Sequence, residues 1–336
     1  MNVAPAKKKI HYWLDDFLTP LKQYLDNPAV QEISINKPGA VFIEEIGASH
    51  MKEYAVEAMT AETIARIGEQ VAAHTGQFIN ETNPILSASL PTGERIQVVL
   101  PPVAPEGGMI SIRKQVVNNL TLEEYRDKGA LNKVAVYSSD ITDDDRHLRE
   151  LLAKKDIYGF LKFAVQSRVT ILVSGGTASG KTTFLNACLQ TVGKEERIIT
   201  LEDTRELTPP QRNVARLVAS RGGQGIANIG ILELLESSLR MRPDRLFVGE
   251  IRGSEAFAFL RAINTGHPGS MATIHADTPS GAYEQLCMMV MQAGLGGAFS
   301  KADLMDYIKS VIPIVVQLRK VGGQRGISDI LFTRGE

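Results

Sequence analysis

The stretch Gly175-Gly176-Thr177-Ala178-Ser179-Gly180-Lys181-Thr182 matches the phosphate-binding pattern G-x-x-x-x-G-K-[ST] at every fixed position. Residues 169–173 before it form a β-branched run, which is typical of a buried parallel strand, and residues 183–190 after it suit a helix. A strand, a glycine-rich loop and a helix N-terminus in this order aim backbone N–H groups at a polyphosphate. We therefore predict that the loop, together with Thr183, binds a nucleotide. A glycine-rich turn that matches by chance is the alternative.

Two residues of this loop have chemical roles of their own. Lys181, at the predicted start of the helix, can reach the β and γ phosphates of a bound nucleoside triphosphate. The Thr182 hydroxyl can ligate Mg²⁺. The motif therefore predicts a nucleoside triphosphate as ligand and Mg²⁺ as cofactor.

From residue 169 onward, predicted strands and helices alternate, which indicates an α/β domain with a parallel sheet covered on both faces. The predicted strands are 169–174, 197–201, 246–249, 271–275, 312–318 and 327–332, and the predicted helices are 181–191, 231–241, 254–264 and 280–293. Residues 1–116 combine a hairpin at 30–46, a helix after Thr60 and later strands, which predicts a smaller α+β domain. Residues 117–156 lack this periodicity and are predicted to be a linker, so the second domain spans 157–336.

Composition argues against several classes of function. The 336 residues carry a formal net charge of −1, which argues against a constitutive nucleic-acid binder because there is no basic excess. The two cysteines form no C-x-x-C pair, so neither a zinc site nor a disulfide framework is predicted. No apolar run approaches the roughly 18 to 20 residues that a membrane span needs. We therefore expect a cytoplasmic protein that contacts membranes only peripherally.

Residues at the carboxyl ends of the predicted parallel strands are candidates for the site, because these ends meet at one edge of a sheet. Glu250 follows the strand at 246–249 and is the best candidate for a general base. Gly249 stands where a Walker B strand usually has its Mg²⁺-binding aspartate, so we expect Glu202 or Asp203 to support the metal together with Thr182.

His275 follows the apolar run at 271–274 and can donate a hydrogen bond to the terminal phosphate. A solvated pair of turn carboxylates is the alternative for Glu202 and Asp203, and a structural histidine is the alternative for His275.

Arginines are further candidates, because a fixed cation stabilises the charge that spreads over the γ-phosphoryl oxygens during hydrolysis. Ring-shaped ATPases often take this arginine from a neighbouring subunit. The candidates in this chain, among which the sequence alone does not choose, are Arg95, Arg113, Arg205, Arg240, Arg242, Arg245 and Arg252.

Together these motifs resemble those of the hexameric traffic ATPases of type IV secretion and conjugation systems, a branch of the secretion ATPase superfamily. Leu201-Glu202-Asp203 resembles the family's aspartate box, and Gly249-Glu250 resembles the ending of its atypical Walker B strand. The other matching segments are 25–39, 90–102, the phosphate-binding loop, 239–253 and the histidine box at 265–276.

The resemblance implies a RecA-like P-loop domain preceded by a PAS-like domain, with nucleotide between the two, in a ring of six identical subunits. It implies Mg²⁺-dependent ATP hydrolysis that energises substrate translocation or pilus biogenesis. It also implies that Arg95 and Arg113 reach the nucleotide, which completes the predicted catalytic set of Lys181, Glu250, Glu202, His275, Arg113 and Arg95. The expected partners are other ATPases and inner-membrane components of the secretion machine, at the cytoplasmic face of the inner membrane.

Three other functions remain open at this point. A motor of type II secretion or type IV pili is the nearest, although assembly motors of that branch often carry paired C-x-x-C motifs that this chain lacks. A nucleotide-switch scaffold would bind ATP and turn it over only incidentally. A nucleic-acid translocase is disfavoured by the near-neutral charge.

Overall fold

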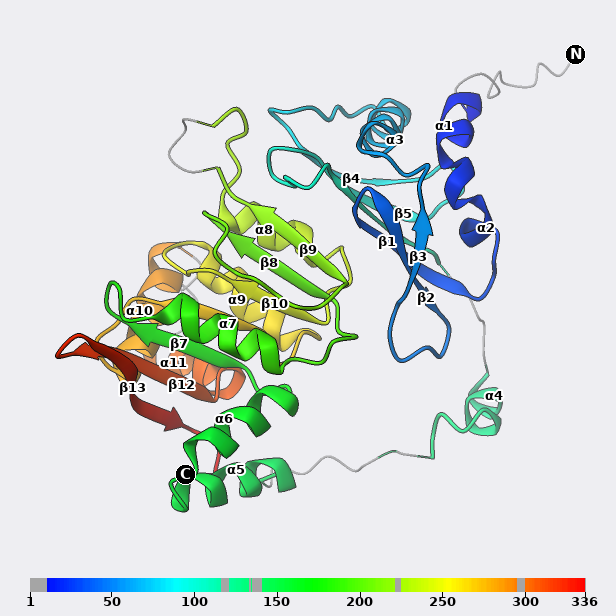
Figure 1. Ribbon diagram of the computed structural model, residues 1–336. Helices are drawn as coiled ribbons and strands as arrows, with labels where there is room; N and C mark the ends of the chain where they lie inside the picture. The colour runs from blue at the N-terminus through cyan, green and yellow to red at the C-terminus, as the bar shows by residue number, and fades with distance from the viewer. Residues whose placement is uncertain are drawn as a thin grey trace, which may run out of the picture.

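The computed structural model describes residues 11–115, 121–132, 134, 141–220, 225–294 and 300–335. Two sheets follow one another along the chain, each with its own helices, so the chain forms two domains (Figure 1). The α/β class predicted from the sequence, with a smaller α+β domain in front, is confirmed. Among the described residues, no helix combines the length and the apolar character that a membrane crossing requires.

The first domain is a six-stranded antiparallel sheet with helices packed on one face. Its strand order is β3-β2-β1-β6-β5-β4, so β1 and β6 pair although about 75 residues separate them in the sequence. Thr60 caps the long helix α3 by accepting a hydrogen bond from Thr63 N, and the apolar face of α3 packs against the sheet and α1. The elements are α1 (His11–Leu18), a 3₁₀ turn (Thr19–Leu21), α2 (Lys22–Leu25), β1 (Val30–Lys37), β2 (Gly39–Glu45), β3 (Lys52–Val56), α3 (Ala61–His74), β4 (Ile85–Ser89), β5 (Arg95–Val99) and β6 (Met109–Arg113).

The second domain is built on a seven-stranded sheet in the order β13-β12-β7-β11-β10-β8-β9, in which only β13 runs antiparallel to its neighbour. This confirms the predicted parallel-rich sheet. The strands are β7 (Ile171–Gly175), β8 (Ile198–Glu202), β9 (Val214–Val218), β10 (Arg245–Val248), β11 (Met271–Ile274), β12 (Ile314–Val321) and β13 (Gln324–Phe332). The helices after β7 are α7 (Lys181–Thr191), α8 (Ile231–Ser238), α9 (Glu255–Asn264), α10 (Pro279–Gln292) and α11 (Lys301–Val311).

Helices cover both faces of this sheet, which explains why β7, β8, β10 and β11 are buried along their whole length. Alternate residues of one strand contribute to opposite cores. Leu246 packs with α8, α9, α10 and α11, whereas Phe247 packs with α7 and with α6 (Ile157–Gln166). The carboxyl ends of the central strands stay uncovered and are free to form a site.

The segment expected to be a linker contains two helices, α4 (Leu122–Asp127) and α5 (Asp143–Ala153). Thr142 and Asp145 form a capping box at the start of α5, and the acidic first turn favours this end of the helix electrostatically. Asp145 is buried and lies 3.5 Å from Arg334, and α5 packs on α6. The structure therefore differs from the expected linker, because α5 belongs to the helical layer of the second domain. Residues 116–120, 133 and 135–140 of this segment lie outside the described part of the chain.

A polar interface joins the two domains at the edge formed by β8 and β9. Arg197 is fully buried there and donates from Nη1 to Asn36 Oδ1 of the first domain at 2.7 Å and to Asn213 Oδ1 at 2.6 Å. Gln97 Nε2 donates to Ser237 Oγ at 2.9 Å across the same interface. Separating the domains would break these hydrogen bonds and expose the interface to water. The domains of this chain therefore form one packed unit.

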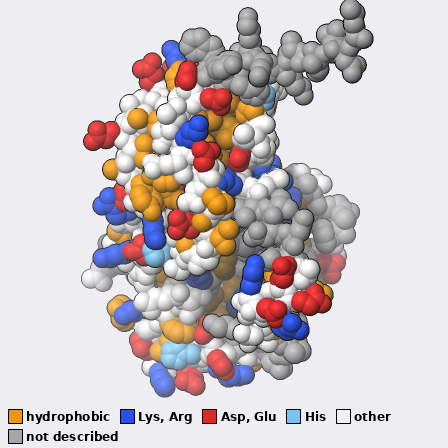
Figure 2. Space-filling model, turned by 90° about the vertical axis from the view of Figure 1, so that its right-hand side faces the viewer, with side chains coloured by type: hydrophobic (Ala, Val, Ile, Leu, Met, Phe, Trp, Pro, Cys, Tyr) orange, Lys and Arg blue, Asp and Glu red, His pale blue; other side chains and the backbone are white. Residues whose placement is uncertain are grey.

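Charged side chains are mixed on the molecular face shown in Figure 2. Basic and acidic groups of the described residues intersperse there, and hydrophobic side chains gather toward the first domain, at the top of the view. A nucleic-acid binder would present a basic stripe. This face has the mixed character that the net charge of −1 suggests.

Candidate nucleotide-binding site

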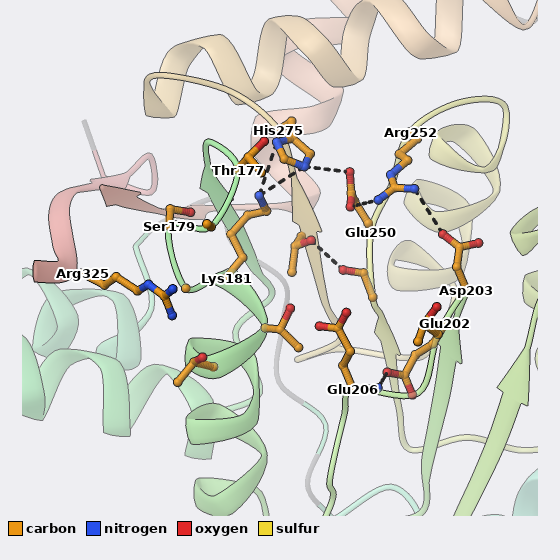
Figure 3. A pocket seen from close by; sticks show the side chains of 17 residues that line it. Thr177, Ser179, Lys181, Glu202, Asp203, Glu206, Glu250, Arg252, His275 and Arg325 are labelled. Atoms are coloured by element: carbon orange, nitrogen blue, oxygen red, sulfur yellow. Dashed lines mark hydrogen bonds and ion pairs between the residues drawn. The ribbon is translucent and has the colours of Figure 1, made fainter. Parts of the chain in front are cut away.

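A pocket of about 460 Å³ lies at the carboxyl edge of the second sheet, where β7, β8, β10 and β11 end (Figure 3). Every residue that lines it comes from the second domain. The lining comprises Thr177–Thr183 of the loop, Glu202, Asp203, Thr204, Glu206, Gly249, Glu250, Arg252, Thr273, His275 and Arg325. The structure thus brings together most of the predicted site residues, from strands that are distant in the sequence.

The phosphate-binding loop leads directly from β7 into α7, whose first residue is Lys181. Gly180 precedes it with a φ of +98°, a conformation that favours glycine. Lys181 Nζ donates to the carbonyl oxygens of Gly175 and Gly176 at 2.8 and 3.1 Å, and it lies 3.4 Å from both ring nitrogens of His275. Burial lowers the pKa of the Lys181 ammonium group. The lysine is therefore held at the loop, ready to exchange carbonyl contacts for phosphate contacts.

Gly175 is required by close packing. A Cβ at this position would lie 2.7 Å from the carbonyl oxygen of Leu318 on β12 and 2.5 Å from Ser179 Oγ. Gly175→Ala should therefore lower the free energy of unfolding by about 1–3 kcal/mol, as other overpacking substitutions do. Urea unfolding of the purified protein measures this, and Gly176→Ala is the matched control because its Cβ would meet no atom within 4 Å. Equal stabilities of the two variants would contradict the packing role.

Glu250 lies at the centre of the pocket, just beyond β10. Its carboxylate contacts the Arg252 guanidinium, and its Oε1 lies 3.2 Å from His275 Nε2. Burial, and then the nearby Lys181 charge, lower the pKa of His275, which favours the neutral imidazole with one N–H to donate. Arg252 also reaches Asp203, at 3.4 Å. A carboxylate, a neutral imidazole and a lysine therefore converge on one space.

Glu202 is 2% exposed, and its two carboxylate oxygens have different surroundings. Its Oε1 accepts hydrogen bonds from the backbone N–H groups of Glu206 and Leu207, each at 2.8 Å, so it shapes the turn after β8. Its Oε2 is buried and lies close to the Thr200 hydroxyl, although this contact falls outside ordinary hydrogen-bond geometry. Burial raises the pKa of this carboxyl group, and the contacts with Glu206, Leu207 and Thr200 oppose that effect. One oxygen thus has a structural role in the turn, and the other is next to Thr200.

Arg95 and Arg113 do not reach this pocket. They face each other across the β5–β6 pair. Together with Arg240 they line a separate cavity of about 480 Å³. This cavity shares no lining residue with the nucleotide pocket. Arg113 pairs there with Glu32 at 2.9 Å. Within one chain, the nucleotide pocket therefore lacks the two arginines that the family resemblance implies.

The remaining candidate arginines divide into two groups. Arg252 lines the nucleotide pocket, as described above. Three others are held in ion pairs that support the fold, namely Arg205 with Glu106, Arg242 with Glu44, and Arg245 with Glu196.

Sequence reasoning missed one cation of the pocket. Arg325 reaches it from the last hairpin of the chain, 144 residues after Lys181 (325 − 181), so no local motif marks it. The available indication was that Arg325 lies just before the strand predicted at 327–332.

Comparisons with known proteins place this site in context. Residues 15–322 match the family model described as type II/IV secretion system protein. The chain is 38% identical over 327 residues to the type IV secretion system protein VirB11 of Bartonella henselae, covering 94% of this chain and 91% of that protein. It is 34% identical over 306 residues to protein VirB11 of Rhizobium radiobacter, covering 90% and 88%. The crystal structure of the VirB11 ATPase from the Brucella suis type IV secretion system, in complex with sulphate, matches with a TM-score of 0.90 at 34% identity, covering 96% and 95%.

Proposed function

This chain belongs to the type II/IV secretion system protein family, and we propose that within this family it is an ATPase of a bacterial type IV secretion system. The observation that carries the proposal is the convergence of Lys181, Glu250 and His275 in one pocket, on a scaffold similar over nearly its whole length to a type IV secretion ATPase. ATP hydrolysis there energises substrate translocation or pilus biogenesis.

The loop, Lys181, Glu250 and His275 each have a part in the proposed reaction. The backbone N–H groups of the loop and the Lys181 ammonium group bind the β and γ phosphates. Glu250 orients the attacking water and accepts its proton, and the neutral His275 donates a hydrogen bond to the γ phosphate. The contact between Glu250 Oε1 and His275 Nε2, now 3.2 Å, opens for this step, because a neutral imidazole has a single N–H to donate.

Mg²⁺ fits the residues present. Among the described residues there is no preformed cluster of three or more His, Cys, Asp or Glu side chains. That suits a cation which is bound by one or two protein ligands, by waters and by the phosphates of its substrate. The Thr182 hydroxyl and the carboxylates of Glu202 and Asp203 all line the pocket and are oxygen ligands of the kind Mg²⁺ prefers, so these groups would hold the ion or its waters. When bound, Mg²⁺ neutralises charge on the β and γ phosphates.

We further propose a ring of six subunits in which Arg95 and Arg113 act on a nucleotide bound to a neighbouring subunit. Two observations support this arrangement. The arginines lie in a cavity separate from the nucleotide pocket of their own chain. The polar interface around the buried Arg197 resists the domain movement that would carry them there.

The trans role of the arginines predicts complementation. Arg113→Ala should lower turnover on the order of tenfold to a hundredfold, because a cation that stabilises the transferring phosphoryl group is lost. An equal mixture of this variant with Glu250→Gln subunits should regain activity. In randomly mixed rings, roughly a quarter of the interfaces pair an intact Glu250 with an intact Arg113. The activity should therefore rise to at most about a quarter of the parent's. Phosphate release by the mixture measures this.

Two controls accompany the mixing experiment. Arg113 also pairs with the buried Glu32, so thermal unfolding must show that the variant is folded. Arg95→Ala, at an exposed position, provides a second variant of the same cavity. A mixture no more active than its two components would contradict the trans arrangement.

The oligomer and its location complete the proposal. Size-exclusion chromatography with light scattering, with and without ATP, should detect six subunits when nucleotide is bound; a monomer under both conditions would contradict the ring. We place the ring at the cytoplasmic face of the inner membrane, with other ATPases and inner-membrane components of the secretion machine as partners. The family relationship supports this placement.

A further inference from the structure

The hairpin formed by β12 and β13 runs beside the phosphate-binding loop. Strand β12 pairs with β7 in parallel, with Leu318 opposite Gly175, the first residue of the loop. Residues after 318 therefore continue past the end of β7 alongside the loop. Arg325, near the start of β13, extends from this hairpin into the lining of the nucleotide pocket (Figure 3).

Arg325 lies against Gly180, the residue that precedes α7. Its Cδ is 3.4 Å and its Cβ 3.8 Å from the position that a Cβ on Gly180 would occupy. Gly180 precedes Lys181, and the first N–H groups of the helix are the ones that bind phosphate oxygens. The side chain of Arg325 is therefore beside the phosphate-binding end of the loop.

Two positively charged side chains lie next to each other near the tip of the hairpin. Arg325 is directly opposite Lys320 in the β12–β13 register, so both side chains lie on one face, where like charges destabilise a strand pair. Both are exposed, and among the described residues neither has an ion-pair partner. Asp329, the one carboxylate within β13, pairs instead with Arg319 at 3.7 Å. An anion bound beside the hairpin would offset this repulsion.

The strand order shows which part of a nucleotide would lie there. β11, β10 and β8, which position His275, Glu250 and Glu202, are on one side of β7, whereas β12 and β13 are on the other. Figure 3 shows the same division, with Arg325 and Glu250 on opposite sides of Lys181. The phosphate that is cleaved lies next to Glu250, so the far side of the loop faces the phosphates nearer the nucleoside.

We propose that Arg325 binds the nucleoside-proximal phosphates of the bound nucleotide, within its own subunit. The inference rests on the proposed ATPase function and adds a binding residue to that site. In this scheme Arg325 contributes to binding of the nucleotide, and Glu250 contributes to the chemical step. The loss of Arg325 should therefore affect KM much more than kcat.

The test combines ATP hydrolysis with calorimetric ADP binding to the full chain. Arg325→Ala should raise KM for ATP and Kd for ADP about five- to tenfold, the size expected for one charge-assisted contact, with kcat changed by less than about twofold. Arg325→Lys should restore most of the affinity, and the effect should shrink at high salt because the contact is ionic and exposed. An affinity for Arg325→Lys as weak as that of Arg325→Ala would contradict recognition of the phosphates.

Arg319→Ala is the matched control, because it removes the same charge from the same hairpin at a residue that pairs with Asp329. Its ADP affinity should equal that of the parent. The melting temperature of Arg325→Ala without nucleotide should be unchanged or higher, since the repulsion from Lys320 is removed; a merely structural role would lower it.

The possible failures can be told apart. If the parent chain binds no ADP or ATP, the proposed function is wrong and this inference falls with it. If the parent binds nucleotide and Arg325→Ala binds it equally well, only the role of Arg325 is refuted.

Discussion

Lys181→Ala should reduce ATP hydrolysis on the order of a hundredfold or more. The lysine is the side-chain cation of the loop, and its removal takes away the charge that binds the β and γ phosphates as negative charge develops on them. It also leaves the carbonyl oxygens of Gly175 and Gly176 without the ammonium donor that they now share. Both ATP binding and turnover should therefore fall. Steady-state phosphate release and ADP calorimetry measure the two effects.

Lys162→Ala is the control for this substitution, because Lys162 is an exposed residue on α6 of the same domain. Its activity should match the parent's. Thermal unfolding of both variants excludes a general loss of structure. If Lys181→Ala retained the parent's turnover, the loop would not be the phosphate site.

Glu250→Gln should lower kcat on the order of a hundredfold to a thousandfold while ATP binding is kept. The substitution preserves the shape of the side chain but removes the carboxylate that accepts the proton of the attacking water, and general base catalysis contributes an effect of this order. Glutamine cannot form the ion pair with Arg252 that the carboxylate makes. ATP affinity should therefore stay equal or rise. Single-turnover hydrolysis and calorimetry separate chemistry from binding.

Glu236→Gln, on the exposed face of α8, is the matched control and should have the parent's kcat. A Glu250→Gln variant with normal kcat would remove Glu250 from the chemistry. A variant that no longer bound ATP would instead assign Glu250 to binding.

The sequence predicted the centre of the site because its chemistry is encoded locally. The loop 175–182 has one established geometry, and Glu202, Glu250 and His275 each follow a strongly apolar strand. Parallel strands bring such positions together whatever their separation in the chain. Residues 177–182 of the loop and the three strand-end residues do line one pocket.

The features that the sequence did not predict depend on contacts between distant segments. Arg325 enters the pocket because β12 pairs with β7 in a particular register, which no pattern near residue 325 records. Arg197 is a charged residue within a buried region, and only the docking of the first domain supplies its partner Asn36. The strands β3, β4 and β9 were not predicted, and β3 is mostly exposed, so it lacks the apolar alternation that marks a half-buried strand.

The acidic run at 143–145 illustrates a second reason. A cluster of aspartates is usually a solvated surface, yet here it forms the first turn of α5. The deciding interactions are the capping box with Thr142 and the packing of α5 on α6. The capping pattern involves only a few residues, and the packing depends on a helix elsewhere in the chain. The charge run alone therefore does not predict the helix.

Phosphate release from ATP by the purified chain, with Glu250→Gln prepared in parallel, tests the central proposal most directly. We expect steady turnover by the parent in the presence of Mg²⁺ and a rate lower by on the order of a hundredfold or more for the variant, although both bind ATP. ATP binding without turnover by the parent, or equal rates for the two proteins, would contradict an ATPase that uses this site.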